Sequence, residues 1–113
     1  MESFFTEDEM KCPCCGKMMM DQTFMKKLNV ARFMAGFPFV VSSGYRCPAH
    51  NEEVGSTSTN HTTGQAADVR CVNDAERYNM IWAMIGAGIK GIGVGKGFVH
   101  GDINRSIPKL WTY

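Results

Sequence analysis

Two histidines and one aspartate are the residues of this chain best suited to bind a metal ion. His61 and Asp68 bound the segment HTTGQAAD at 61–68, and His100 follows in FVHGD at 98–102. Two imidazoles and a carboxylate suit a catalytic zinc ion that keeps one position open for water. The chain has 3 histidines, and two of them lie in these segments. The pattern therefore predicts a metal centre with hydrolytic chemistry.

The spacing of these residues allows them to meet at one ion. The chain can leave His61, turn at Gly64 and return along a strand, so that Asp68 faces the same side. His100 lies inside an apolar segment, where an imidazole without a partner is costly. If the strand that holds His100 pairs beside the strand of Asp68, both side chains can face one ion. The alternative is three unrelated polar residues, which composition alone does not exclude.

Size and composition indicate a single globular domain. The chain has 113 residues, of which 44% are hydrophobic and 20% charged, enough for one modest core. The net charge of +1 argues against nucleic acid as a partner. No stretch approaches the roughly 20 apolar residues that cross a bilayer, so we expect no membrane partner. Residues 1–8 are acidic and do not resemble a signal peptide. We also expect the protein to be a monomer.

Two helices are expected to support the site. Residues 1–20 are expected to form an irregular lead-in that contains cysteines. Asp21 can cap a helix that runs to about residue 35, with apolar residues at a helical period. Asn73 can cap a second helix. We expect its apolar face to consist of Tyr78, Ile81, Trp82 and Ile85.

Short strands alternate with these helices. We expect strands at 39–43, 65–71, 91–94 and 98–103. The segment 44–63 is predicted to be a loop with one helical turn near its middle. A loop of this length in so small a domain is either functional or disordered. This order predicts an α+β domain over residues 1–113, with a small antiparallel sheet flanked by helices.

The 5 cysteines suggest a second, weaker metal pattern. Cys12 and Cys15, in CPCCG, have the spacing of a zinc knuckle. A structural zinc site needs four ligands, and the other two would have to come from Cys47, Cys71 or His50. We expect a tight turn with buried thiols, or an adventitious disulfide, instead. A zinc-ribbon-like interaction protein built on these cysteines is the alternative.

Three segments form a linked pattern. They are SGYRCPAHN at 43–51, TNHTTGQAAD at 59–68 and FVHGD at 98–102. Together they resemble the signatures SGYR-x-x-x-HN, S-x-H-x-x-G-x-A-x-D and FVH-x-D of the zinc D-alanyl-D-alanine carboxypeptidases. They are most similar to the short members among bacterial and phage cell-wall enzymes. Thr59 stands where the family usually has serine, and it retains the hydroxyl.

The resemblance implies a fold, a cofactor and a ligand set. The implied fold is a small antiparallel sheet flanked by helices, shared with D-alanyl-D-alanine dipeptidases and hedgehog-like domains. The implied cofactor is zinc (Zn2+), with His61, Asp68 and His100 as its ligands. The family motif assigns Arg46 to substrate binding or carbonyl stabilisation, and we expect Tyr45 beside it to contact substrate.

The general base remains open at this point. Asp102 lies two residues from His100, so on a strand it shares that face and could reach a metal-bound water. It could instead orient a ligand imidazole. Some branches of the fold carry the catalytic acid three residues before the last histidine, and that position is Gly97 here.

The resemblance implies a zinc-dependent peptidase that hydrolyses an amide bond in peptidoglycan stem peptides. The bond is either a terminal D-alanyl-D-alanine bond or an internal L-alanyl-D-glutamate bond. We expect a phage or prophage endolysin that is made in the cytoplasm and acts in the periplasm or cell wall after release, with a bacterial cytoplasmic or precursor-trimming enzyme as the alternative. The alternative is a non-catalytic, zinc-containing binding domain of hedgehog-like or phage structural type.

Overall fold

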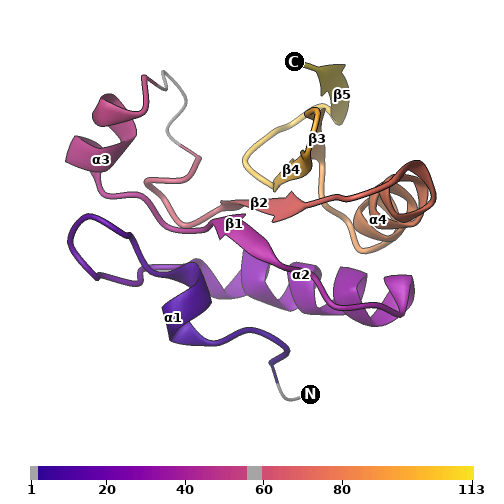
Figure 1. Ribbon diagram of the computed structural model, residues 1–113, viewed down its shortest axis with the longest axis horizontal. Helices are drawn as coiled ribbons and strands as arrows, with labels where there is room; N and C mark the ends of the chain where they lie inside the picture. The colour runs from indigo at the N-terminus through magenta and orange to yellow at the C-terminus, as the bar shows by residue number, and fades with distance from the viewer. Residues whose placement is uncertain (1–2, 56–59) are drawn as a thin grey trace.

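A five-stranded sheet organises the chain (Figure 1). The computed structural model describes residues 3–55 and 60–113. The strand order is β1-β2-β4-β3-β5, and all neighbours pair antiparallel except β3 and β5, which are parallel. The strands are β1 (Val41–Ser43), β2 (Ala66–Arg70), β3 (Gly91–Val94), β4 (Phe98–Asp102) and β5 (Lys109–Thr112). The predicted α+β class, with a mostly antiparallel sheet, is confirmed.

Helices begin where polar side chains cap their first turns. The four helices are α1 (Glu7–Met10), α2 (Gln22–Ala35), α3 (Pro48–Glu53) and α4 (Asp74–Gly86). The Asp21 carboxylate accepts a hydrogen bond from the Phe24 amide at 2.9 Å, and Asn73 caps α4 through the Glu76 amide. Both caps were predicted from the sequence. Within the described residues, none of these helices is long and apolar enough to cross a membrane.

The core lies between the sheet and the pair of long helices. α2 and α4 pack against each other on one side of the sheet (Figure 1). They contribute buried apolar side chains from one stripe of each helix, and the strands contribute alternate residues. The central members are Phe24, Leu28, Ala31, Val69, Met80, Met84, Ile92 and Val99. Because alternate strand residues enter this core, the residues between them face the other side of the sheet.

The buried face of α4 differs from the prediction. Three of the four expected residues are largely exposed, namely Tyr78 at 72%, Trp82 at 52% and Ile85 at 59%. The residues that enter the core are Met80, Ala83 and Met84, all at 0% exposure. Six consecutive apolar residues occupy positions 80–85, so periodicity could not select one face. Packing against α2 and the sheet selected the unbranched methionines, which fill irregular space.

The lead-in is also more ordered than expected. Thr6 and Glu9 form a capping box that starts α1, so residues 1–20 are not irregular throughout. Met10, at the end of this short helix, is 1% exposed and belongs to the main core. Its carbonyl accepts a hydrogen bond from the Tyr45 amide at 2.8 Å, which ties the lead-in to the long loop. A helix of four residues is too short to show a helical period of apolar residues, so the sequence pattern did not predict α1.

Two neighbouring residues of α4 test which face is buried. Met84→Ala should lower the free energy of unfolding by about 2–5 kcal/mol, because it removes a fully buried side chain. Ile85→Ala should change it by less than about 0.5 kcal/mol, because that side chain is mostly exposed. Urea denaturation followed by circular dichroism measures both. Equal losses in the two variants would contradict the assigned face.

Candidate metal centre

The pairing of β2 with β4 brings two of the predicted ligands together. Asp68 lies directly opposite His100 in the antiparallel register. Their neighbours Ala67, Val69 and Val99 are buried in the core, so Asp68 and His100 face the opposite side of the sheet. This is the pairing on which the sequence argument depended. It converts two residues far apart in the chain into neighbours.

The third ligand candidate reaches the same point from the loop before β2. His61 Nε2 lies 3.4 Å from Asp68 Oδ1, and His100 Nδ1 lies 2.9 Å from the same oxygen. The three donor atoms lie within 4.8 Å of one another. A tetrahedral zinc ion with bonds of about 2.0–2.2 Å holds its ligand atoms about 3.3–3.6 Å apart. The donor types are those that zinc prefers, and the 3.4 Å separation lies within this range, whereas the 2.9 Å separation is shorter and would have to lengthen slightly when an ion binds.

Each imidazole is oriented by a hydrogen bond on its far nitrogen. His61 Nδ1 lies 2.8 Å from the Gly44 carbonyl oxygen, to which it donates, so Nε2 is left to face the ion. His100 Nε2 lies 2.7 Å from Asp102 Oδ2, so Nδ1 is left to face the ion. Partners of this kind fix the ring orientation and the tautomer of metal-binding histidines. The ligand geometry is therefore set by the protein before a metal binds.

Asp102 supports His100 from behind. Its side chain is fully buried, and its two oxygens accept hydrogen bonds from Arg105 Nε at 2.8 Å and Nη2 at 3.0 Å, besides the contact with His100. Asn60 donates a further bond at 3.3 Å. Of the two roles left open by the sequence, this geometry supports orientation of the imidazole. A carboxylate so engaged does not face the open side of the site.

Arg105 is the functional residue that sequence reasoning missed. It reaches Asp102 from three residues later and stacks its guanidinium over the Trp111 ring, 4.5 Å from the centroid. The residue lies in an irregular segment after β4, where no hydrophobic period or motif marks it. The only available signal was its proximity in sequence to the FVHGD motif.

The electrostatics of the site keep both carboxylates ionised. Burial raises the pKa of Asp68, but hydrogen bonds with His100 and His61 outweigh it and hold the pKa far below its usual range. Burial likewise raises the pKa of Asp102, and hydrogen bonds from His100 and Arg105 more than reverse this. The pKa of His100 is lowered by burial but raised more by Asp102 and Asp68. Two anionic groups around the imidazoles favour a divalent cation at this point.

A cavity of about 510 Å³ opens beside the three ligand candidates. Two arginines and an aromatic wall line it together with the ligand candidates. Its lining consists of Arg46, Val54, Gly55, His61, Asp68, Phe98, His100, Arg105, Trp111 and Tyr113. The fourth position of a zinc ion held by these ligands would therefore face space that a substrate can enter.

Two glycines of strand β3 allow residues of the site to pack closely against the strand. A Cβ atom on Gly91 would clash with the Asp102 carboxylate, and one on Gly93 would lie 2.7 Å from the Trp111 ring. Glycine at these alternate positions lets the Asp102–Arg105 pair and the indole lie directly on the strand. The close approach explains why β5, although distant from the ligands in sequence, contributes to the site.

Arg46 reaches the cavity, whereas Tyr45 does not. The Arg46 guanidinium contacts Ser43 Oγ at 3.0 Å and Asp68 Oδ2 at 3.4 Å, and it lines the cavity. Tyr45 is 6% exposed and packs in the main core, which corrects the expectation that it contacts substrate. Adjacent residues in this extended segment point to opposite sides, so only one can face the site. Thr59 lies outside the described residues.

Comparison with known protein families matches most of this chain. The profile of the family described as Peptidase M15 matches residues 3–102, which include the lead-in, the loop and both histidines of the candidate metal centre. A search of curated proteins finds no match.

The support of His100 by Asp102 can be tested on metal affinity. Asp102→Asn should weaken zinc binding at this centre by roughly 10–100-fold, because the neutral amide oxygen is a weaker acceptor for the His100 Nε2–H than the carboxylate. Competition titration with a zinc-sensitive dye measures the affinity. Asp8→Asn changes a side chain that is 87% exposed and serves as the control. An unchanged affinity in a folded Asp102→Asn protein would contradict the role.

Proposed function

Because the chain belongs to the peptidase M15 family of zinc peptidases, we propose that it is a zinc-dependent peptidase that hydrolyses an amide bond in peptidoglycan stem peptides. The observation that carries the proposal is the gathering of His61, Asp68 and His100 beside an arginine-lined cavity. Zinc held by these residues would polarise a peptide carbonyl and lower the pKa of bound water to about 7. Residues of the chain would bind and orient the substrate.

Arg46 is positioned to bind a substrate carboxylate. Besides Ser43 and Asp68, its guanidinium contacts Asn51 Oδ1 at 3.4 Å, so three elements of the loop and sheet fix its plane. A fixed guanidinium recognises a carboxylate through two parallel hydrogen bonds. Stem peptides carry free carboxylates at their D-amino acids, and such a group fits the cationic side of this cavity.

Arg105 and the aromatic residues complete the substrate side. Arg105 is held by Asp102 and by the Trp111 ring, so its charge stays at the cavity wall. The ring centroids of Phe98 and Tyr113 lie 5.2 Å apart. The two rings provide an apolar surface that would exclude water from a bound substrate peptide. The volume of about 510 Å³ lies within the range typical of small-ligand sites, which suits a short peptide segment.

The proposal leaves two bonds as candidates, the terminal D-alanyl-D-alanine bond and the internal L-alanyl-D-glutamate bond. Either reaction would take place in the periplasm or cell wall. We propose an endolysin of phage or prophage origin that reaches this layer after release from the cytoplasm. The cationic cavity supports a substrate with a carboxylate close to the cut bond.

A non-catalytic binding domain is the second candidate. Among the described residues that line the cavity, Asp68 is the only carboxylate, and it is a metal-ligand candidate. Asp102 is engaged by His100 and Arg105, and Gly97 occupies the position where some branches carry an acid. No described carboxylate therefore stands ready as the general base, which favours a domain that binds stem peptides without cutting them.

Digestion of purified sacculi separates the two candidates. The zinc-loaded protein should release shortened stem peptides with new termini, and removal of zinc with a chelator should abolish release, because water activation requires the ion. Mass spectrometry of the muropeptides identifies the bond. His61→Ala protein serves as the inactive control. Zinc-loaded protein that binds sacculi but leaves every stem intact would support the binding domain and overturn the peptidase.

Arg46 tests the nature of the substrate. Arg46→Ala should lower kcat/KM by about 10–100-fold on a stem peptide with a free carboxylate near the cut bond, because a charge-assisted hydrogen-bond pair is lost. The same peptide with that carboxylate amidated should be affected far less. Zinc content is measured in parallel, since Arg46 also contacts Asp68. Equal losses of kcat/KM on both peptides would rule out the carboxylate contact. Arg32→Ala is the matched control, because Arg32 lies on α2 outside the cavity.

A further inference from the structure

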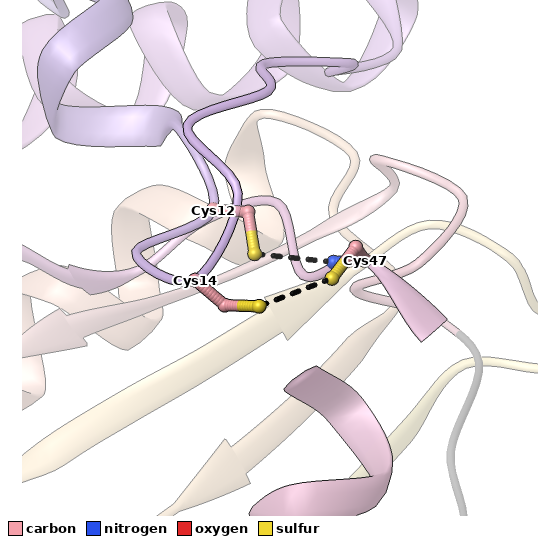
Figure 2. Close-up of side chains that lie close together, drawn as sticks. All are labelled: Cys12, Cys14 and Cys47. Atoms are coloured by element: carbon pink, nitrogen blue, oxygen red, sulfur yellow. Dashed lines mark hydrogen bonds between the residues drawn. The ribbon is translucent and has the colours of Figure 1, made fainter. Parts of the chain in front are cut away.

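A second cluster of metal-binding side chains lies where the lead-in meets the start of α3. The thiols of Cys12, Cys14 and Cys47 point toward one another from two segments far apart in the sequence (Figure 2). Their three sulfur atoms lie within 4.8 Å of one another. None of these residues lines the cavity of the candidate metal centre. The family match and the proposed function leave this cluster unexplained.

The distances in this cluster fit a metal better than a disulfide. The sulfur atoms of Cys14 and Cys47 are 3.8 Å apart, whereas a disulfide bond is about 2.0 Å long. A tetrahedral zinc ion with Zn–S bonds of about 2.3 Å holds its sulfur ligands about 3.8 Å apart. All 5 cysteines are free thiols in the structure. The spacing is therefore that of ligands around an ion.

Two backbone hydrogen bonds on Cys12 close the CPCCGK turn at residues 12–17. The Cys12 amide donates to the Lys17 carbonyl at 2.7 Å, and the Gly16 amide donates back to the Cys12 carbonyl at 2.8 Å. Gly16 closes the turn with a φ of 74°, in the left-handed region that favours glycine. A turn closed in this way places the cysteines at its tip on one side, next to the segment that begins α3.

Amide groups point at the sulfur atoms. The Cys47 amide donates to the Cys12 sulfur at 3.4 Å, and the His50 amide donates to the Cys47 sulfur at 3.4 Å. Amide donors of this kind stabilise negative charge on sulfur, as a metal–thiolate site requires.

Cys15 is the candidate for a fourth sulfur ligand, because it follows Cys14 directly in the same turn. Its sulfur is not among the three that lie within 4.8 Å of one another, so its exposed side chain would have to turn toward them when an ion binds. Structural zinc is almost always four-coordinate, and four cysteines meet that requirement without a water ligand. The sequence favoured a turn with buried thiols, but Cys14 and Cys15 are exposed, so burial in an apolar core does not account for them.

We propose that Cys12, Cys14, Cys15 and Cys47 bind a second, structural zinc ion. Four thiolates close its coordination sphere, so the ion holds segments together and does not activate water. On binding, the thiols release their protons to solvent and form four Zn–S bonds. The ion joins the lead-in to the loop that carries Arg46, whose amide donates to the His61 carbonyl at 3.1 Å. It therefore stabilises the loop that borders the candidate metal centre.

The His61→Ala background isolates this site from the candidate metal centre. Wild-type protein should contain two zinc ions per chain by elemental analysis, and His61→Ala protein should retain one. Cobalt added to metal-stripped His61→Ala protein should give intense thiolate-to-cobalt charge-transfer absorption. No metal in that variant, or iron as its only metal, would overturn the proposal. Loss of the histidine centre alone would instead contradict the proposed function, so the two failures are distinguishable.

Cysteine variants identify the ligands. In the His61→Ala background, zinc at about 100 times its dissociation constant should raise the unfolding midpoint by roughly 10 °C. Addition of Cys47→Ser or Cys15→Ser should remove that shift. Cys71→Ser is the matched control, because Cys71 is a buried cysteine that donates to the Asn73 carbonyl and lies outside the cluster. A shift that survives Cys47→Ser would overturn the site.

Alkylation of the wild-type protein tests the site without any substitution. Under native conditions zinc should protect Cys14 and Cys15 from iodoacetamide, and chelation should expose them, as peptide mass spectrometry will show. These two thiols are exposed, so without a metal nothing in the fold shields them. Equal labelling with and without zinc would overturn the proposal. A Cys14–Cys47 disulfide in protein purified without oxidant would do the same.

Discussion

The antiparallel register between β2 and β4 is the constraint on which the rest of the site depends. It sets Asp68 opposite His100, and the alternation of strand residues turns both side chains away from the helices. A slip of one residue would send the ligands into the core and the core residues toward the cavity. The apolar residues Val69 and Val99, both fully buried, oppose that slip. The hydrophobic core therefore maintains the position of the polar site.

This arrangement buries the charge of the Asp102 carboxylate, and hydrogen bonds to neighbouring side chains compensate for its lost hydration. Asp102 is fully buried and ionised, which would be strongly unfavourable for an isolated carboxylate. It is stabilised by His100 on one side and by the guanidinium of Arg105 on the other. Arg105 in turn stacks on Trp111 from the parallel edge strand. Removing His100 or Arg105 would take a hydrogen-bond partner from the buried Asp102 carboxylate, so the network orients the ligand candidate as a unit.

The segment between β1 and α3 links the two clusters of candidate metal ligands. The Gly44 carbonyl orients His61, Arg46 borders the cavity, and Cys47 belongs to the thiol cluster. The Tyr45 amide is bonded to Met10, and the Tyr45 side chain is buried in the core. Four consecutive residues thus contact four different parts of the molecule. A structural ion at the thiol cluster would add a further constraint on the position of this segment.

The sequence by itself predicted most of the helices and strands and the residue types of the candidate site, and the tertiary structure decided which groups face it. The caps at Asp21 and Asn73 and the ligand candidates around Gly64 could be named from the sequence because capping, turns and side-chain type are local properties. The buried face of α4, the direction of Tyr45 and the contribution of Arg105 were not. Each of these depends on which surfaces pack together in the fold. Where neighbouring side chains have similar polarity, the sequence pattern alone does not show which of them will be buried. The same reason separates the two cysteine interpretations, since only the folded chain brings Cys47 to the turn that holds Cys12.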